Sequence, residues 1–94
     1  MDLIINFKDR GKIELQLKCG RVLTDTLTFE FEANLDSVLI TAVDKILKRN
    51  RINPLSLKTI KISGNVEKSS SAYKIAQTFI EAIKASKQAI IADS

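Results

Sequence analysis

The side chains able to catalyse a reaction or bind a metal ion are few in this sequence. The 94 residues include no histidine and a single cysteine, Cys19, which excludes Ser/His and Cys/His pairs and zinc sites built from Cys and His. Carboxylates are the remaining candidates: Asp2, Asp9, Asp25, Asp36 and Asp44. None has a partner at a spacing that indicates a site. We therefore expect solvated carboxylates, no catalytic, cofactor-binding or metal-binding residue, and a protein that is not an enzyme.

Cys19 and the overall composition indicate where such a chain resides. Cys19 follows Leu15 and Leu17 in strict alternation, which predicts a core residue rather than a nucleophile. A lone cysteine cannot form an intramolecular disulfide and favours a reducing compartment. The chain is 45% hydrophobic and 28% charged, with a net charge of +4, which is typical of a globular domain. With no signal peptide and no membrane-length apolar run, we expect a cytoplasmic protein that does not bind membranes.

The N-terminal third has the two-residue periodicity of β-strands. Residues 3–7 form a short apolar run, and residues 12–19 and 26–32 alternate between apolar and polar side chains. Such alternation indicates strands with one buried and one wet face. Polar or glycine-containing segments separate the three strands, which predicts an antiparallel meander.

The pattern changes to helical periodicity near residue 34. Asn34 or Asp36 can cap a helix that runs to about Asn50, and Pro54 prevents its continuation. Residues 57–62 are rich in β-forming side chains, and Ser69–Ser71 can cap a second helix over 72–87, with 89–91 as an extension or a short tail. The order β-β-β-α-β-α predicts a single α/β domain, residues 1–94, with a mixed four-stranded sheet, a parallel fourth strand and two helices on one face.

This order, together with three segments, resembles the N-terminal domain of the TsaB (YeaZ) family, which has the actin-like ATPase (RNase H-like) fold and acts in tRNA threonylcarbamoyladenosine formation. Residues 38–47 resemble the family's first helix, residues 55–62 its next strand, and residues 66–76 its glycine-rich signature. Of that signature, Ser69 and Ile75 are retained and Ser71 and Lys74 are conservative, while its glycines and proline are absent. Asn6 stands where the family's first strand ends in Asp. The resemblance implies the fold without the phosphate-binding loop.

Both helices have more apolar surface than a single sheet requires. The apolar side chains of residues 35–47 cover roughly 200° of a helical projection, and those of residues 72–83 cover roughly 180°. A helix on one sheet needs an apolar stripe of only about 100°. The surplus predicts an exposed apolar patch between the helices, which usually marks an interface, although mutual packing of the two helices would account for it equally well.

The resemblance implies how such a patch is used. TsaB-like proteins pair through these two helices with a second copy or with the catalytic paralogue TsaD. We therefore expect a non-catalytic interaction module that forms a homodimer or a heterodimer with a TsaD-like protein. Helix phase and this mode of pairing give the predicted partner-contact residues: Leu39, Val43, Ile46, Tyr73, Ala76, Ile80 and Ile83.

The alternative function is a small basic nucleic-acid-binding domain, with tRNA as the first candidate. Basic side chains gather at the end of the first predicted helix and beyond it: Lys45, Lys48, Arg49, Arg51, Lys58, Lys61 and Lys68. They would attract phosphates. Basic residues are also ordinary at a helix C-terminus, and no aromatic stacking set accompanies them, so nucleic-acid binding ranks second to protein pairing.

Overall fold

The computed structural model describes the backbone of residues 1–9, 11–32, 34–67 and 69–93, and the side chains of the same ranges as far as residue 85. Its elements follow the predicted order with one unpredicted 3-10 helix: β1 (Asp2–Phe7), β2 (Lys12–Cys19), β3 (Val22–Glu30), α1 (Leu35–Arg49), η1 (Pro54–Ser56), β4 (Thr59–Gly64) and α2 (Ser71–Asp93). Within the described parts of the chain, neither α-helix combines the length and the hydropathy needed to cross a membrane.

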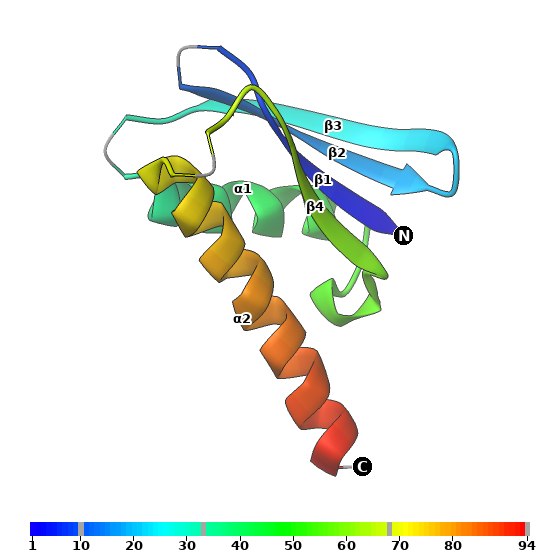
Figure 1. Ribbon diagram of the computed structural model, residues 1–94. Helices are drawn as coiled ribbons and strands as arrows, with labels where there is room; N and C mark the ends of the chain where they lie inside the picture. The colour runs from blue at the N-terminus through cyan, green and yellow to red at the C-terminus, as the bar shows by residue number, and fades with distance from the viewer. Residues whose placement is uncertain (10, 33, 68, 94) are drawn as a thin grey trace.

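The strands form one mixed sheet in the order β3-β2-β1-β4. β2 is antiparallel to both β1 and β3, whereas β4 is parallel to β1 with Leu3 opposite Ile60. Both α-helices lie on the same face of the sheet, and α2 begins beneath it and slants away from it towards the C-terminus (Figure 1). The predicted mixed sheet with a parallel fourth strand and two helices on one face is confirmed.

The core lies between this sheet face and α1. Alternate residues of β1 and β2 are buried, so that Leu3, Ile5, Leu15 and Leu17 all point towards the helices. α1 buries a stripe with helical spacing that includes Leu39. Each such side chain contributes about 1.5–3 kcal/mol when fully buried, so α1 is held mainly by its packing on β2, β3 and α2.

The helix starts differ in how they are capped. Asn34 precedes α1, but its side chain makes no capping hydrogen bond. At the start of α2, Ser70 Oγ accepts a hydrogen bond from the Tyr73 backbone N–H at 3.1 Å. The serine cap predicted for the second helix is therefore confirmed, and α2 continues through residues 89–91 to Asp93.

Cys19 was predicted to lie in the core, and the structure corrects this. The pairing of β1 with β2 ends at Asp2 and Lys18, and the register shift at Leu17 and Lys18 in the pairing of β2 with β3 leaves Thr24 of β3 without an opposite residue. Cys19 therefore lies on the part of the β2–β3 hairpin that extends beyond β1, and its side chain is exposed. β3 likewise begins at Val22, ahead of the predicted start at residue 26.

Gly64 ends β4 where the chain passes close to β1. Its φ is +91°, and a Cβ at this position would overlap the Phe7 carbonyl oxygen and lie 2.7 Å from the Phe7 nitrogen. The next residue, Asn65, donates its backbone N–H to the same carbonyl at 2.9 Å. Only glycine combines this conformation with such a close approach.

Candidate functional site

Most of the predicted partner-contact residues are part of the core. Leu39, Val43, Ile46, Ala76 and Ile80 are at most 7% exposed, and Tyr73 and Ile83 are half-buried. Burial keeps Val43, Ile46, Ala76 and Ile80 from a partner, so the predicted face is corrected for them, whereas Leu39 also lines the hollow between α1 and α2. They lie at the centre of each helix's apolar arc, and the sheet covers that centre.

The exposed apolar surface lies instead at the margin of the two arcs, in a groove between α1 and α2. This helix groove has a volume of about 380 Å³ and an almost entirely apolar wall formed by Leu39, Ile40, Ile75, Phe79 and Ala82. Ile40 is 55% exposed, the most of any large apolar side chain on the described part of either helix. The apolar surplus predicted between the two helices is therefore present, mainly on residues outside the predicted contact set, although Leu39 belongs to both.

The groove continues past the end of α1 onto η1. Ile40, Phe79 and Ala82 also line an adjoining hollow of about 440 Å³, whose other walls include Pro54, Leu55 and Ile83. Leu55 is 36% exposed. The 3-10 helix that holds it starts at Pro54 and is capped by the Asn53 side chain, which accepts the Leu55 backbone N–H at 2.9 Å. One apolar strip thus connects α1, α2 and η1.

Polar side chains border the helix groove near the start of both helices. Asp36 of α1 and Lys74 of α2 line it with opposite charges, and Thr78 of α2 lines it as well. A polar rim around an apolar centre is the usual composition of a protein–protein interface. Phe79 supplies an aromatic side chain near the centre of the strip, the type most often found as an interface anchor.

Sequence reasoning missed Ile40, Ile75, Phe79 and Leu55 because it took the centre of each apolar arc as the partner face. The spacing of Leu35, Leu39, Val43 and Ile46 contained the missing signal. These four residues, spaced by four, four and three positions, mark the middle of the apolar stripe of α1, and that middle packs on the sheet. Side chains at the border of the stripe, such as Ile40, are then left for another surface.

The candidate catalytic carboxylates are scattered over the fold. Most of them already interact with a neighbouring side chain: Asp2 with Thr59, Asp9 with Asn65, Asp25 with Arg49 and Asn50, and Asp44 with Lys48. Asp36 lines the helix groove. Among the described residues, no three His, Cys, Asp or Glu side chains lie close enough together to hold a metal ion. The structure therefore brings no carboxylate pair together for catalysis in the parts it describes.

Comparison with known proteins adds no relative to this picture. The chain matches no protein-family model, and no curated protein matches its sequence.

Proposed function

We propose that this chain is a non-catalytic module that pairs with another protein chain by burying the helix groove. The observation that carries the proposal is the exposed apolar strip that joins Ile40 of α1, Phe79 of α2 and Leu55 of η1. A contiguous apolar strip with a polar rim on a small domain usually marks a protein interface. The segments that resemble the TsaB family support two partners, a second copy or a TsaD-like subunit in tRNA threonylcarbamoyladenosine modification.

The size of the groove bounds how tightly it can bind alone. Ile40 and Leu55 are about half and one third exposed, so full burial of these two and Phe79 would contribute only about 3 kcal/mol. Association itself costs at least about 4 kcal/mol. A stable interface of about 800 Å² per partner must therefore extend from the groove over its rim.

The structure changes which substitutions test this proposal. Val43→Glu and Ile80→Glu, suggested by helix phase alone, would place a charge in the core and unfold the protein rather than separate it from a partner. Ile40→Glu places the charge on the exposed side of α1. Thr41→Glu is the matched control, because Thr41 is exposed and lines a different hollow, between α1 and β3.

The test is light scattering after size-exclusion chromatography, alone and with a TsaD-like protein. We expect the parent chain and Thr41→Glu to form a complex with one of these partners. Ile40→Glu should bind the same partner at least tenfold more weakly. The thermal midpoints of all three chains should agree within a few degrees. The proposal would be contradicted if the parent chain stayed monomeric up to about 1 mM and also did not bind the TsaD-like protein. At that concentration even a Kd of about 1 mM would show association.

A further inference from the structure

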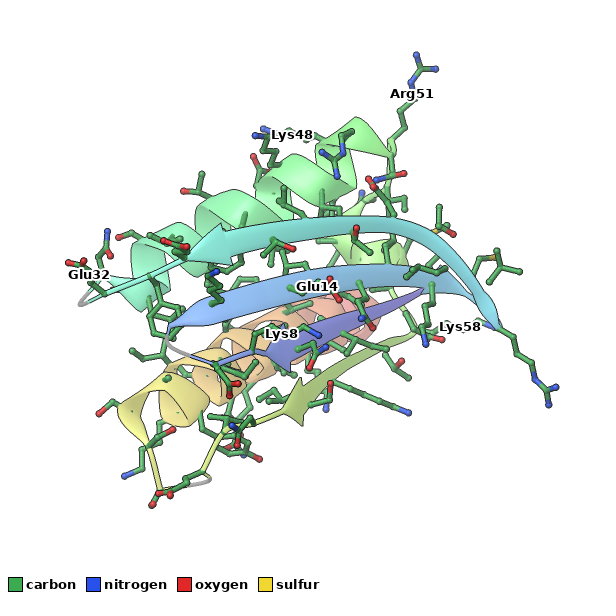
Figure 2. The ribbon with its side chains drawn as sticks, turned by 90° about the horizontal axis from the view of Figure 1, so that it is seen from above. Lys8, Glu14, Glu32, Lys48, Arg51 and Lys58 are labelled. Carbon is green, nitrogen blue, oxygen red and sulfur yellow. The ribbon has the colours of Figure 1, made fainter. Side chains whose placement is uncertain are left out.

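The charges of this protein are distributed unevenly between the two ends of the sheet. Unpaired positive side chains gather where β1 begins, β2 ends and α1 ends, a group that we name the basic end: Lys18, Arg21, Arg51, Lys58 and Lys61. At the other end, five acidic side chains outnumber Lys8 and Lys12, of which Lys12 pairs with Glu30; the acidic side chains are Asp9, Glu30, Glu32, Asp36 and Glu67. Figure 2 shows Arg51 and Lys58 near one end of the sheet and Glu32 at the other.

The strand register places the basic side chains around one carboxylate. Asp2 is opposite Lys18 on β2 and Thr59 on β4, and Ile4, two residues further along the same sheet face, is opposite Lys61. The Thr59 hydroxyl donates to Asp2 Oδ1 at 2.7 Å. This hydrogen bond lowers the pKa of Asp2, and the nearby positive charges of the N-terminus, Lys61 and Lys58 lower it further. The carboxylate therefore lies in a positive potential that it does not neutralise.

Ion pairs balance two of the three cations of α1, Lys48 and Arg49, while Lys45 makes none within the described residues. Lys48 pairs with Asp44 at 3.0 Å and Arg49 with Asp25 at 2.8 Å, so these two charges are already balanced. Among the described residues, no ion pair involves the cations of the basic end. Arg21, Arg51, Lys58 and Lys61 are exposed, and Lys18 is half-exposed. They are available to an anion that approaches from solvent.

We infer that the basic end binds the phosphate backbone of a nucleic-acid duplex. Four strands are about 14 Å wide across the sheet, and each strand of a duplex carries one phosphate about every 3.4 Å of helix axis. The end is therefore wide enough to face about four phosphates, and its five cations exceed that number by one. No aromatic side chain belongs to it, so the contacts are to phosphates and independent of base sequence.

A lipid surface is the competing anionic partner, because Val22 and Leu23 are 67% and 50% exposed on the adjacent hairpin. Membrane attachment requires the apolar and basic side chains to reach one plane. Here the exposed apolar pair is confined to the hairpin tip, while Arg51 and Lys58 extend from different sides of this end (Figure 2). The apolar pair and the basic side chains therefore share no single plane, which favours a highly charged polyanion such as a duplex over a lipid surface.

The test is fluorescence anisotropy with a labelled RNA hairpin and a labelled DNA duplex, each of about 20 base pairs, between about 50 and 200 mM salt. The parent chain should bind both duplexes, with log K falling against log salt at a slope of about −4. Arg51→Gln/Lys58→Gln should reduce this slope by about 2 and weaken binding at least tenfold at low salt. Both positions are exposed, so the thermal midpoint should stay within a few degrees.

The matched control is Lys8→Gln/Lys12→Gln, which removes the same net charge at the opposite end of the sheet. It should weaken binding less than about twofold, because cations that do not contact phosphate release no counterions. Equal losses in the two double variants would overturn the inference and reduce the interaction to attraction by net charge. Failure to bind either duplex at low salt would overturn it as well. Binding to phosphatidylserine-containing vesicles without binding to duplex would overturn it in favour of a lipid surface.

Discussion

At the scale of single residues, Asp25 joins the end of α1 to the edge of the sheet. Its carboxylate accepts hydrogen bonds from Arg49 Nε and Asn50 Nδ2, both at 2.8 Å. Arg49 Nη2 also donates to the Thr26 carbonyl oxygen at 2.9 Å. Hydrogen bonds to an ionised group are stronger than neutral ones, so this cluster fixes the C-terminus of α1 against β3.

The Asp25 cluster predicts a pH-dependent stability. The hydrogen bond from Asn50, followed by those from Arg49 and the Thr26 backbone, lowers the pKa of Asp25 below its ordinary value of 3.8. A lowered pKa in the folded state stabilises the protein above the unfolded pKa, and the effect is lost as the pH falls through the folded pKa. Asp25→Asn should therefore lower the thermal midpoint near pH 7, and the gap to the parent should close below about pH 4.

Thermal unfolding followed by circular dichroism from neutral pH to about pH 2.5 measures this gap. Asp44→Asn is the control, because its exposed ion pair with Lys48 contributes little to stability. A gap between Asp25→Asn and the parent that stays constant down to about pH 3 would contradict the assigned role of the carboxylate.

Gly64 is the second residue whose chemistry the fold depends on. Gly64→Ala should lower the free energy of unfolding by about 2 kcal/mol or more, because it combines a left-handed φ with overlap on the Phe7 backbone. Gly20→Ala is the matched comparison, since Gly20 has a φ of +65° but no atom within 4 Å of an added Cβ. Its cost should be only about 1 kcal/mol. Equal losses in urea titrations would exclude the close approach as the cause.

At the scale of elements, α1 has a core face and a groove face on neighbouring residues. Leu39 is fully buried and Ile40 is 55% exposed. Leu39→Ala should therefore cost about 3 kcal/mol of unfolding free energy, whereas Ile40→Ala should cost less than about 1 kcal/mol. Urea denaturation of the two variants measures both values. A larger loss for Ile40→Ala would mean that α1 packs on the sheet through a different face, with Ile40 rather than Leu39 in the core.

The elements themselves follow from local patterns, which is why the sequence predicts them well. Two-residue alternation identifies β1 and β2, and Pro54 and Ser70 mark helix ends by steric and capping effects that operate over a few residues. The partner face does not follow in this way. Whether Val43 or Ile40 is exposed depends on which side of α1 meets the sheet, a tertiary property that a projection of one helix leaves open.

Cys19 illustrates the same distinction on a strand. Its alternation with Leu17 is genuine, but burial also requires a neighbouring strand and helix over that position. β1 ends its pairing one residue earlier, and no local pattern specifies where a neighbouring strand begins. Strand identity is thus readable from sequence, whereas the length of the hairpin that extends beyond the sheet is not.

At the scale of the whole molecule, the helix groove and the basic end adjoin at η1. The centre of the groove lies between α1 and α2, but its extension includes Pro54 and Leu55, which lie in the chain between Arg51 and Lys58. Substitutions at sites without shared partners are usually additive. Ile40→Glu, which changes a residue of α1 rather than η1, should therefore leave duplex binding within about twofold of the parent. Fluorescence anisotropy on this variant and the parent measures this independence.

The parallel pairing of β1 with β4 also determines when this fold can be completed. Thr59 contacts Asp2 across 57 positions of the chain, so β1 gains its second neighbour, β4, only after these intervening residues have been synthesised. Until then the β1–β2–β3 hairpins can form, but one side of β1 stays open. Long-range closure of this kind slows folding. Until β4 pairs with β1, the open edge of β1 can pair with a strand of another chain.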